Sequence, residues 1–185
     1  MDRTPPPSTP PPATPDTGFT VGDIAPNLIA YDQDDHAAPL YRFAQQALLL
    51  DFCTAWCGLC QLMAPSVTPI TEALRNAGIA FTYLPVLLQN YRFLPATADD
   101  AGAWARRYGI TTPVLQPRGA PDAEAWQQFL EYAASANPGV VGFPTLVFLD
   151  PDHRIQKLNA GFMSADDIQH QFDPNLPFLA DAAAP

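Results

Sequence analysis

Three cysteines, Cys53, Cys57 and Cys60, lie within eight consecutive residues and are the only cysteines of the chain. Cys57 and Cys60 have two residues between them, so at the start of a helix they would lie one turn apart on the same face. Two thiols at that spacing reach disulfide geometry with little movement. The pair therefore predicts dithiol–disulfide chemistry, whereas three cysteines are too few for a disulfide-stapled scaffold.

The first cysteine of the pair is the expected nucleophile. A helix that begins after Cys57 leaves the N–H groups of its first turn without partners inside the helix. These groups and the helix dipole favour the thiolate. We therefore expect Cys57 to be exposed and reactive, and Cys60 to be the more buried thiol that resolves a mixed disulfide. Gly58 would allow close approach of a partner's backbone.

Two metal-centred alternatives use the same cysteines. A structural zinc site would need further ligands, and none of the three histidines lies close to the cysteines in sequence. The spacing of Cys53, Cys57 and Cys60 also matches the cluster motif of radical-SAM enzymes, in which three thiolates hold a four-iron cluster. Cys53, however, belongs to an apolar segment typical of a buried strand rather than a loop. We expect no metal and no organic cofactor.

The apolar pattern predicts the elements that would position the pair. Residues 47–53 are apolar except for Asp51, as expected of a central strand covered on both faces. A helix should follow over residues 57–77, bent or broken by Pro65 and Pro69. The strand would thus deliver the chain directly to the cysteine pair.

The rest of the chain continues an alternation of strands and helices. A second strand over residues 79–88 should be shortened or kinked by Pro85. His153 lies in a later turn, where we expect its side chain to be solvated. The other expected elements are a peripheral hairpin from residues 24–31 and 40–43, helices over residues 97–108, 122–136 and 164–172, and strands over residues 145–150 and 154–158. This alternation implies an α/β layered sheet with its chemistry at the carboxyl ends of strands.

Length and charge limit the remaining classes. The chain has 185 residues, with 9 Lys and Arg against 19 Asp and Glu and a formal net charge of −10. This charge disfavours binding to nucleic acid and to anionic membrane surfaces. No apolar run is long enough for a transmembrane helix, so we expect no membrane insertion.

The first twenty residues lack the apolar stretch of a signal peptide. We therefore expect a cytoplasmic protein, or a periplasmic or cell-envelope protein if a signal or anchor lies outside this sequence. Seven of the first 17 residues are proline, which predicts a disordered proline-rich tether over residues 1–18. Residues 19–180 are expected to form one domain.

Several separate pieces of the sequence together resemble the thioredoxin family. They are similar to the family's central strand, its active-site tryptophan and CxxC, its helix-kinking proline, its cis-proline loop, and the glycine and cap before its last helix. These pieces are, in the same order, residues 50–52, residues 55–60, Pro65, residues 141–146 and residues 161–164. Residues 22–26 and the long middle section resemble the branch that contains peroxiredoxins and bacterial thiol–disulfide reductases of the cell envelope.

The resemblance implies a thioredoxin fold of the α/β class. Its central mixed sheet would be flanked by helices, with an N-terminal extension and a helical insert, about residues 97–138, before the cis-proline strand. It also implies that Asp51 is a buried base that accepts a proton from Cys60, since burial raises the pKa of a carboxyl group. The alternative for Asp51 is a strand residue that faces the surface.

The resemblance further implies a substrate surface around the cysteine pair. Pro144 would follow a cis peptide bond, and the backbone of Phe143 would face outward beside the nucleophile and pair with an extended substrate. The Thr112–Pro113 bond is the rival cis bond. Trp56, Gly58 and Leu59 would belong to the same docking surface.

The sequence departs from the family pattern at several positions. Leu59 replaces the proline that the family often has between the cysteines, and Cys53 stands where an aromatic residue is common. We interpret Cys53 as a small buried apolar residue rather than a redox group. Thr54 and Cys57 match half of the peroxiredoxin motif, but Leu50 occupies the place of its proline.

The expected function is that of a monomeric thiol–disulfide oxidoreductase. Its substrates would be protein dithiols and disulfides, together with an unidentified redox partner. Two alternatives remain at this point: a redox-inert thioredoxin-fold module that only binds proteins, and a thiol peroxidase.

Overall fold

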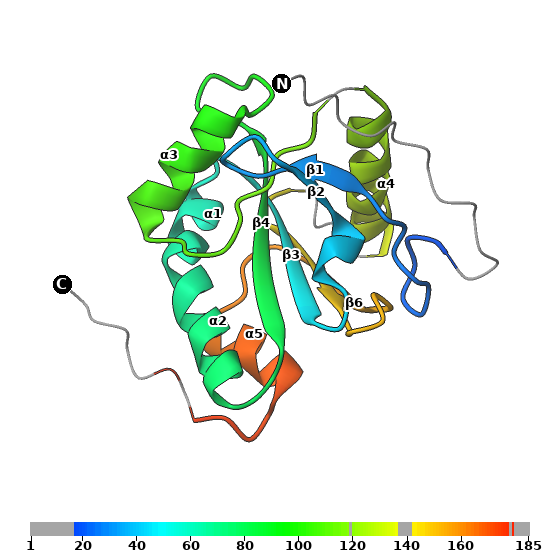
Figure 1. Cartoon of the computed structure of the whole chain (residues 1–185), viewed down its shortest axis with the longest axis vertical. Helices are drawn as coiled ribbons and strands as arrows, with labels where there is room; N and C mark the ends of the chain where they lie inside the picture. The colour runs from blue at the N-terminus through cyan, green and yellow to red at the C-terminus, as the bar shows by residue number, and fades with distance from the viewer. Residues whose placement is uncertain (1–16, 119, 137–141, 178, 180–185) are drawn as a thin grey trace, which may run out of the picture.

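A four-stranded mixed sheet forms the centre of the molecule, which the computed structural model describes over residues 17–118, 120–136, 142–177 and 179 (Figure 1). The strand order is β4-β3-β5-β6. The strands are β3 (Ala47–Thr54), β4 (Phe81–Gln89), β5 (Thr145–Leu149) and β6 (Ile155–Ala160). β3 pairs parallel with β4 and antiparallel with β5, and β6 pairs antiparallel with β5. The predicted mixed sheet is therefore present, with the strand that leads to the cysteines at its centre.

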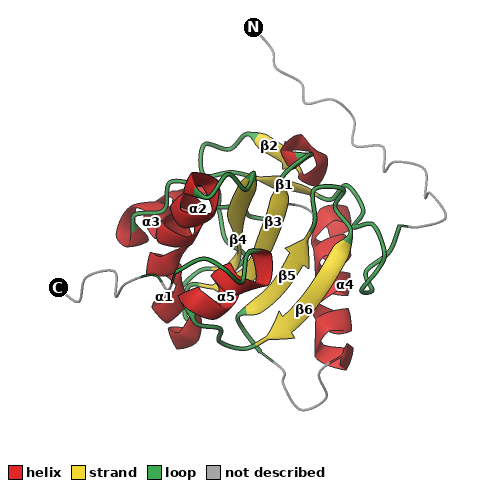
Figure 2. Ribbon diagram, turned by 90° about the horizontal axis from the view of Figure 1, so that it is seen from below, coloured by secondary structure: helices red, strands yellow, loops and turns green. Residues whose placement is uncertain are grey.

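Helices cover both faces of this sheet (Figure 2). One face, here called the thiol face, is covered by α1 (Gly58–Met63), α2 (Val67–Asn76), α3 (Ala98–Tyr108) and α5 (Ala165–Phe172). The other face, here called the α4 face, is covered by α4 (Ala120–Ala136) and by the small sheet of β1 (Ile29–Tyr31) and β2 (Ala37–Pro39). Every residue of β3 is buried, as its nearly continuous apolar sequence predicts for a doubly covered strand.

The alternation of side chains along β3 divides its residues between the two cores. Leu49 and Cys53 pack in the core of the thiol face, whereas Leu48, Leu50 and Phe52 pack in the core of the α4 face. The two-residue period of a strand places Asp51 on the same side as Leu49 and Cys53. The one carboxyl group of this strand therefore points toward the helices that carry the cysteine pair.

The helix predicted over residues 57–77 is broken, as expected. α1 ends at Met63, a 3-10 turn covers Ala64–Ser66, and α2 begins at Val67. Pro65 lies inside that turn. Pro69 is tolerated because it lies in the first turn of α2, where a backbone N–H has no partner within the helix.

The expectation that Pro85 shortens or kinks the second strand is wrong, because β4 runs without a break from Phe81 to Gln89. β4 is an edge strand of the sheet. The carbonyl of Pro85 accepts a hydrogen bond from the N–H of Leu115 on the outer side of β4, away from β3. The nitrogen of Pro85 faces the same side, so its missing N–H removes no hydrogen bond from the β3–β4 ladder.

The remaining helices have bounds within two residues of those predicted. α3 begins one residue after its predicted start, because Thr97 is its N-cap and forms a reciprocal capping box with Asp100. Gly109, with a φ of 64°, is its C-cap. α4 buries Trp126 and Phe129 against the sheet. Residues 137–141, which follow α4, lie outside the described residues.

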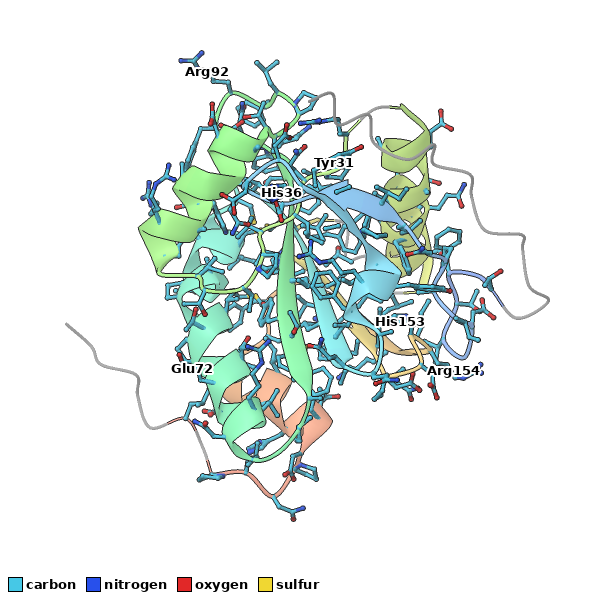
Figure 3. All side chains as sticks on the ribbon, in the orientation of Figure 1. Tyr31, His36, Glu72, Arg92, His153 and Arg154 are labelled. Carbon is cyan, nitrogen blue, oxygen red and sulfur yellow. The ribbon has the colours of Figure 1, made fainter. Side chains whose placement is uncertain are left out.

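The periphery of the molecule differs from the sequence-based expectations. Residues 40–43 form a 3-10 helix rather than the second arm of the hairpin, because the antiparallel partner of β1 is Ala37–Pro39. His153, labelled in Figure 3, is not solvated. It is buried, and its ring stacks on that of Tyr41 at a centroid distance of 4.9 Å. Of the predicted tether, residues 1–16 lie outside the described residues, whereas Gly18 donates a backbone hydrogen bond to Ile24.

Candidate active site

The sulfur of Cys57 lies between the first turn of α1 and the loop before β5. Cys57 is the N-cap of α1, and the backbone N–H of Cys60 donates to its Sγ at 3.2 Å. The thiol of Cys57 in turn donates to the carbonyl oxygen of Phe143 at 3.3 Å. Both cysteines are free thiols. The geometry thus joins the connection between β3 and α1 to the loop that contains Phe143, which lies 86 residues further along the chain.

The expectation that Cys57 is exposed is wrong for the dithiol form. Cys57 is 8% exposed and Cys60 is 1% exposed. Cys57 is buried because the Phe143 carbonyl and the first turn of α1 contact its sulfur from different sides. The prediction that Cys60 is the more buried of the two cysteines still holds.

Asp51 is buried, which removes the alternative that it faces the surface. Its Oδ2 accepts a hydrogen bond from the hydroxyl of Tyr83 at 3.0 Å, and its Oδ1 has no hydrogen-bond partner among the described residues. Burial raises the pKa of Asp51 to about 7, and the Tyr83 hydrogen bond opposes that rise. The carboxyl group can therefore gain or lose a proton near neutral pH.

The Cys60 thiol is protonated at neutral pH. Burial raises its pKa most, and the hydrogen bond with Cys57 and the charge of Asp51 add to the rise. Cys53, which precedes the turn into α1, is also buried, and its pKa is raised by that burial and by the charge of Asp51. The Cys53 thiol lies 3.7 Å from the carbonyl oxygen of Val86. Cys60 therefore needs a base before it can act as a nucleophile.

The loop before β5 contains the one cis peptide bond of the described residues, Phe143–Pro144. The prediction of a cis bond at Pro144 is confirmed, and the rival bond at Thr112–Pro113 is trans. The carbonyl of Phe143 does not face outward, because it accepts the hydrogen bond from the Cys57 thiol. This loop therefore contacts the expected nucleophile directly.

Exposed apolar side chains lie on the segments around Cys57, namely the connection between β3 and α1, α1 itself and the loop after β4. The side chain of Trp56 is exposed, and its indole N–H donates to Oε1 of Gln89 at 2.9 Å. Its ring contacts the rings of Phe93 and Phe143 at centroid distances of 5.2 and 6.0 Å. Leu59 is also exposed, and a Cβ placed on Gly58 would meet nothing within 4 Å. We call the exposed set the apolar rim; its members are Trp56, Leu59, Leu62, Tyr91, Phe93 and Leu94.

Four of the six residues of the apolar rim were missed from the sequence, and Leu62 of α1 is one of them. Tyr91, Phe93 and Leu94 lie in the loop after β4, and Phe93 is 64% exposed with a φ of 60°. The side chain of Asn90 holds this loop, because its Oδ1 accepts the N–H groups of Arg92 and Leu94. Arg92 points away from the molecule at this end (Figure 3). The available signal was the presence of three large apolar residues among the five that follow β4.

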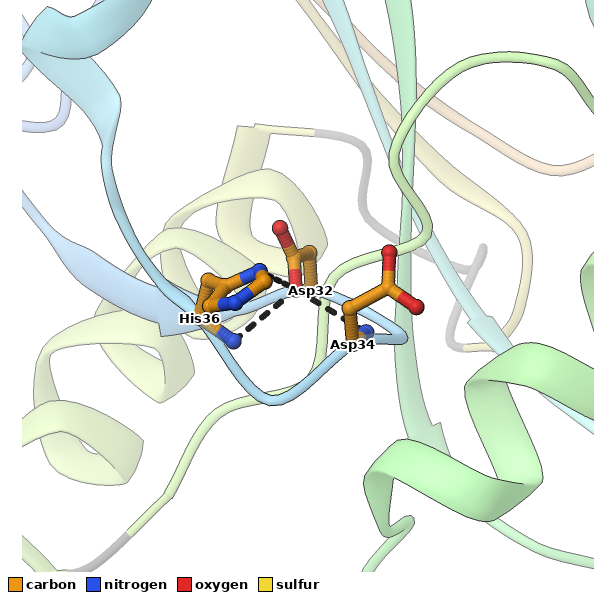
Figure 4. Close-up of side chains that lie close together, drawn as sticks. All are labelled: Asp32, Asp34 and His36. Carbon is orange, nitrogen blue, oxygen red and sulfur yellow. Dashed lines mark hydrogen bonds and ion pairs between the residues drawn. The ribbon is translucent and has the colours of Figure 1, made fainter.

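A second group of polar side chains, Asp32, Asp34 and His36, lies in the turn between β1 and β2 (Figure 4). Oδ1 of Asp32 accepts the backbone N–H groups of Asp34 and His36. These are the hydrogen bonds of an aspartate-stabilised turn, and they account for the arrangement without a ligand.

Among the helices of the described residues, none has both the length and the apolar character needed to cross a membrane.

Comparisons with known proteins agree with this geometry. Residues 28–98 match the family model described as Thioredoxin. The thiol-disulfide oxidoreductase ResA of Geobacillus thermodenitrificans is 21% identical over 161 residues, which cover 87% of this chain and 81% of the relative.

Solved structures show the same architecture. The thioredoxin domain of a thiol-disulfide oxidoreductase from Bacteroides vulgatus matches with a TM-score of 0.62 at 19% identity, covering 86% of this chain and 100% of that one. A secreted disulfide oxidoreductase of Mycobacterium tuberculosis, described as homologous to DsbE of E. coli, matches with a TM-score of 0.58 at 18% identity, covering 78% and 93%. The α/β architecture predicted from the sequence is therefore confirmed as the thioredoxin fold.

Proposed function

Because this chain is a thioredoxin-like protein that resembles thiol–disulfide oxidoreductases, we propose that it exchanges disulfides with protein substrates through Cys57 and Cys60. One observation carries the proposal. The Cys57 sulfur is contacted by the N–H of Cys60 and by the carbonyl of Phe143, and the second thiol of the pair lies one turn away in α1. The proposed nucleophile, the proposed resolving thiol and the cis-proline loop therefore lie close together, which supports the proposal.

The proposed reaction has two exchange steps. The Cys57 thiolate attacks a substrate disulfide, forms a Cys57–substrate disulfide and releases the first substrate thiolate. The Cys60 thiolate then attacks the Cys57 sulfur, forms the Cys57–Cys60 disulfide and releases the second substrate thiolate. The substrate gains two electrons and the cysteine pair loses two, so no metal or organic cofactor takes part. The reverse sequence would oxidise a substrate dithiol.

Asp51 is the proposed base for the second step. The Cys60 thiol keeps its proton at neutral pH because burial raises its pKa, so a proton acceptor is needed where water has little access. The Asp51 carboxyl group lies on the same face of the sheet, and burial raises its pKa to about 7. A base whose pKa lies close to the working pH transfers protons efficiently in both directions.

The apolar rim and the Phe143–Pro144 loop are the proposed docking surface for protein substrates. Exposed aromatic groups gather beside the nucleophile, and Phe93 is held over Trp56 by a loop with fixed hydrogen bonds. Aromatic side chains at the centre of an interface contribute strongly to binding. An extended substrate segment with apolar residues near its cysteine fits this surface.

Replacing Phe93 by alanine is expected to raise KM for a protein disulfide about tenfold, which corresponds to ~1.4 kcal/mol of lost contact. The rate with glutathione disulfide should stay nearly unchanged, because so small a substrate can react at Cys57 without the contact that Phe93 would offer to a protein. Steady-state kinetics with both substrates check this. Val21→Ala, which removes an exposed apolar side chain outside the rim, is the matched control. An equal loss with both substrates would contradict the assignment of Phe93 to docking.

Reduction of insulin disulfides with dithiothreitol as the final reductant tests the proposed function. We expect turnover that depends on Cys57. A protein that binds insulin without any turnover would instead be a redox-inert binding module, and turnover confined to peroxide substrates would indicate a thiol peroxidase. Both outcomes would overturn the proposal.

The compartment and the assembly remain predictions. A cytoplasmic location is the first expectation, and the secreted relative from Mycobacterium tuberculosis supports the alternative of a location outside the cytoplasm. A reduction potential measured against glutathione would indicate the direction of exchange, since a strongly negative value favours a reductase. Equilibrium sedimentation would test the predicted monomer.

A further inference from the structure

We propose that Tyr83 is a positioning residue for the proposed reaction: its hydroxyl binds Oδ2 of Asp51 and leaves Oδ1 as the oxygen that takes the proton of Cys60. This inference rests on the proposed function, because it assigns a partner to the base of the second exchange step. Nothing in the sequence pattern singled out Tyr83, which lies in the middle of the apolar strand β4.

The sheet register brings the two side chains together. Leu49 of β3 pairs with Tyr83 of β4, and Asp51 pairs with Pro85, so Tyr83 is a diagonal neighbour of Asp51 on the thiol face. A diagonal neighbour lies within reach of a long side chain. The phenolic oxygen and Oδ2 of Asp51 are 3.0 Å apart, which is hydrogen-bond distance.

Burial makes this hydrogen bond hard to replace. Tyr83 is 0% exposed and Asp51 is 2% exposed, so water has little access to either group. A hydrogen bond in such surroundings is stronger than one in water, and it fixes the orientation of the carboxyl group. Tyr83 also keeps its own proton, because burial and the charge of Asp51 raise its pKa. It is therefore a donor throughout the reaction.

The two oxygens of Asp51 consequently differ in what they can do. Oδ2 is engaged by Tyr83, whereas Oδ1 is buried and accepts no hydrogen bond from any described residue. Two thiols interact with the Asp51 charge, namely Cys53 on the same strand and Cys60 in α1. The Cys53 thiol is directed to the carbonyl of Val86, which leaves Cys60 as the thiol that exchanges a proton with Oδ1.

Two opposing effects determine the pKa of the Asp51 carboxyl group. Burial raises the pKa of Asp51, and the hydrogen bond from Tyr83 lowers it, because a donor stabilises the charged form. The titratable groups facing Asp51 are Tyr83 from β4, Cys53 from β3 and Cys60 from α1. Among the described residues, no ion pair includes Asp51. Removing the hydroxyl of Tyr83 must therefore raise the pKa of Asp51 above about 7.

The step that Tyr83 supports is balanced in protons and electrons. The proton of the Cys60 thiol moves to Oδ1 of Asp51, and the resulting thiolate attacks the Cys57 sulfur of the mixed disulfide. The Cys57–Cys60 bond forms as the Cys57–substrate bond breaks, and the substrate sulfur leaves with the electron pair. The proton on Asp51 then passes to the departing thiolate or to solvent. Tyr83 changes neither its bonds nor its charge.

The test is Tyr83→Phe, measured as a pH profile of substrate release from a preformed mixed disulfide. We expect the midpoint of the profile to move up by about one pH unit, a tenfold change in the acid dissociation constant. Formation of the mixed disulfide, measured in the Cys60→Ser background, should not change. A ¹³C NMR titration of the Asp51 carboxyl group should show the same upward shift independently of activity.

Three controls separate positioning from a general structural effect. Tyr41→Phe removes a tyrosine hydroxyl that donates to the carbonyl of Ala25, and it should leave the profile unchanged. In the Asp51→Asn background, Tyr83→Phe should have no further effect on the release rate. Should Tyr83→Phe fail to fold, Tyr83→Met also removes the hydroxyl and gives the second measurement.

The outcomes of these experiments are distinguishable. An unshifted Asp51 titration in the variant would overturn the inference while leaving disulfide exchange intact. An equal slowing by Tyr83→Phe with and without Asp51 would overturn it too, because it would indicate a structural role. A wild-type protein that never forms a mixed disulfide would instead overturn the proposed function, and the carboxyl titration would still decide whether Tyr83 tunes Asp51.

Discussion

Replacing Cys57 by serine is expected to abolish disulfide exchange, with a loss of more than about a thousandfold in turnover. A serine hydroxyl in the same place cannot form the covalent sulfur intermediate, and the buried Cys60 cannot substitute for it because its thiol keeps its proton. Insulin reduction measures the loss. Turnover that survives in Cys57→Ser would contradict the assignment of the nucleophile.

The companion variants define the order of the two steps. Cys60→Ser should still form the mixed disulfide with substrate but should not release it, so a covalent complex sensitive to reductant should accumulate on a non-reducing gel. Cys53→Ala should behave like the wild type, since Cys53 is interpreted as a small apolar residue of the core. Accumulation of the complex in Cys57→Ser instead would reverse the roles of the two cysteines.

Asp51→Asn is expected to stabilise the protein at pH 8 while it slows the resolving step. The pKa of Asp51 is raised from 3.8 to about 7 in the folded state, so folding disfavours the charged carboxylate. The neutral acid carries no such penalty below pH 4. The penalty grows between pH 4 and 7 and reaches ~4 kcal/mol above pH 7. Asparagine removes it, because it stays neutral at every pH.

Urea unfolding of the reduced protein at pH 4 and pH 8 measures this effect. The gain in the free energy of unfolding should be close to zero at pH 4 and should approach ~4 kcal/mol at pH 8. Asp152→Asn, which alters an exposed carboxyl group in the turn between β5 and β6, should show no such pH dependence. Equal gains at both pH values would exclude a raised pKa as their cause.

Although Asp51→Asn should stabilise the protein, it should slow the reaction. Without a carboxylate to accept its proton, Cys60 should resolve the mixed disulfide slowly, and the rate should lose its rise through pH 7. Mixed-disulfide formation should stay near the wild-type rate. A variant that is stabilised and yet fully active across this pH range would exclude Asp51 as the base.

The fold was predictable from the sequence to the extent that local pattern decides it. The apolar run of β3, the capping box at Thr97 and the break at Pro65 each have a local cause. The burial of Asp51 was also predictable, because apolar neighbours on both sides place it in a covered strand. The continuous strand through Pro85 was not, since it depends on which edge of β4 meets another segment.

The candidate site was predictable in its cysteines and less so in its surroundings. The Tyr83–Asp51 hydrogen bond depends on the register between two strands, and a sequence alone does not give that register. The burial of Cys57 depends on the Phe143 carbonyl, which approaches from a distant part of the chain. Phe93 was missed because its positive φ and its contact with Trp56 arise only from the folded loop.

The outer edge of β4 has a consequence for how this molecule meets copies of itself. Pro85 has no backbone N–H to donate there. The backbone of Leu115 accepts the N–H of Leu87 and donates its own N–H to the carbonyl of Pro85. A strand from another chain would therefore find no continuous row of donors and acceptors between Pro85 and Leu87. Proline and a covering segment are the means by which edge strands resist intermolecular sheet growth. This part of β4 is therefore protected against pairing with a strand of another chain.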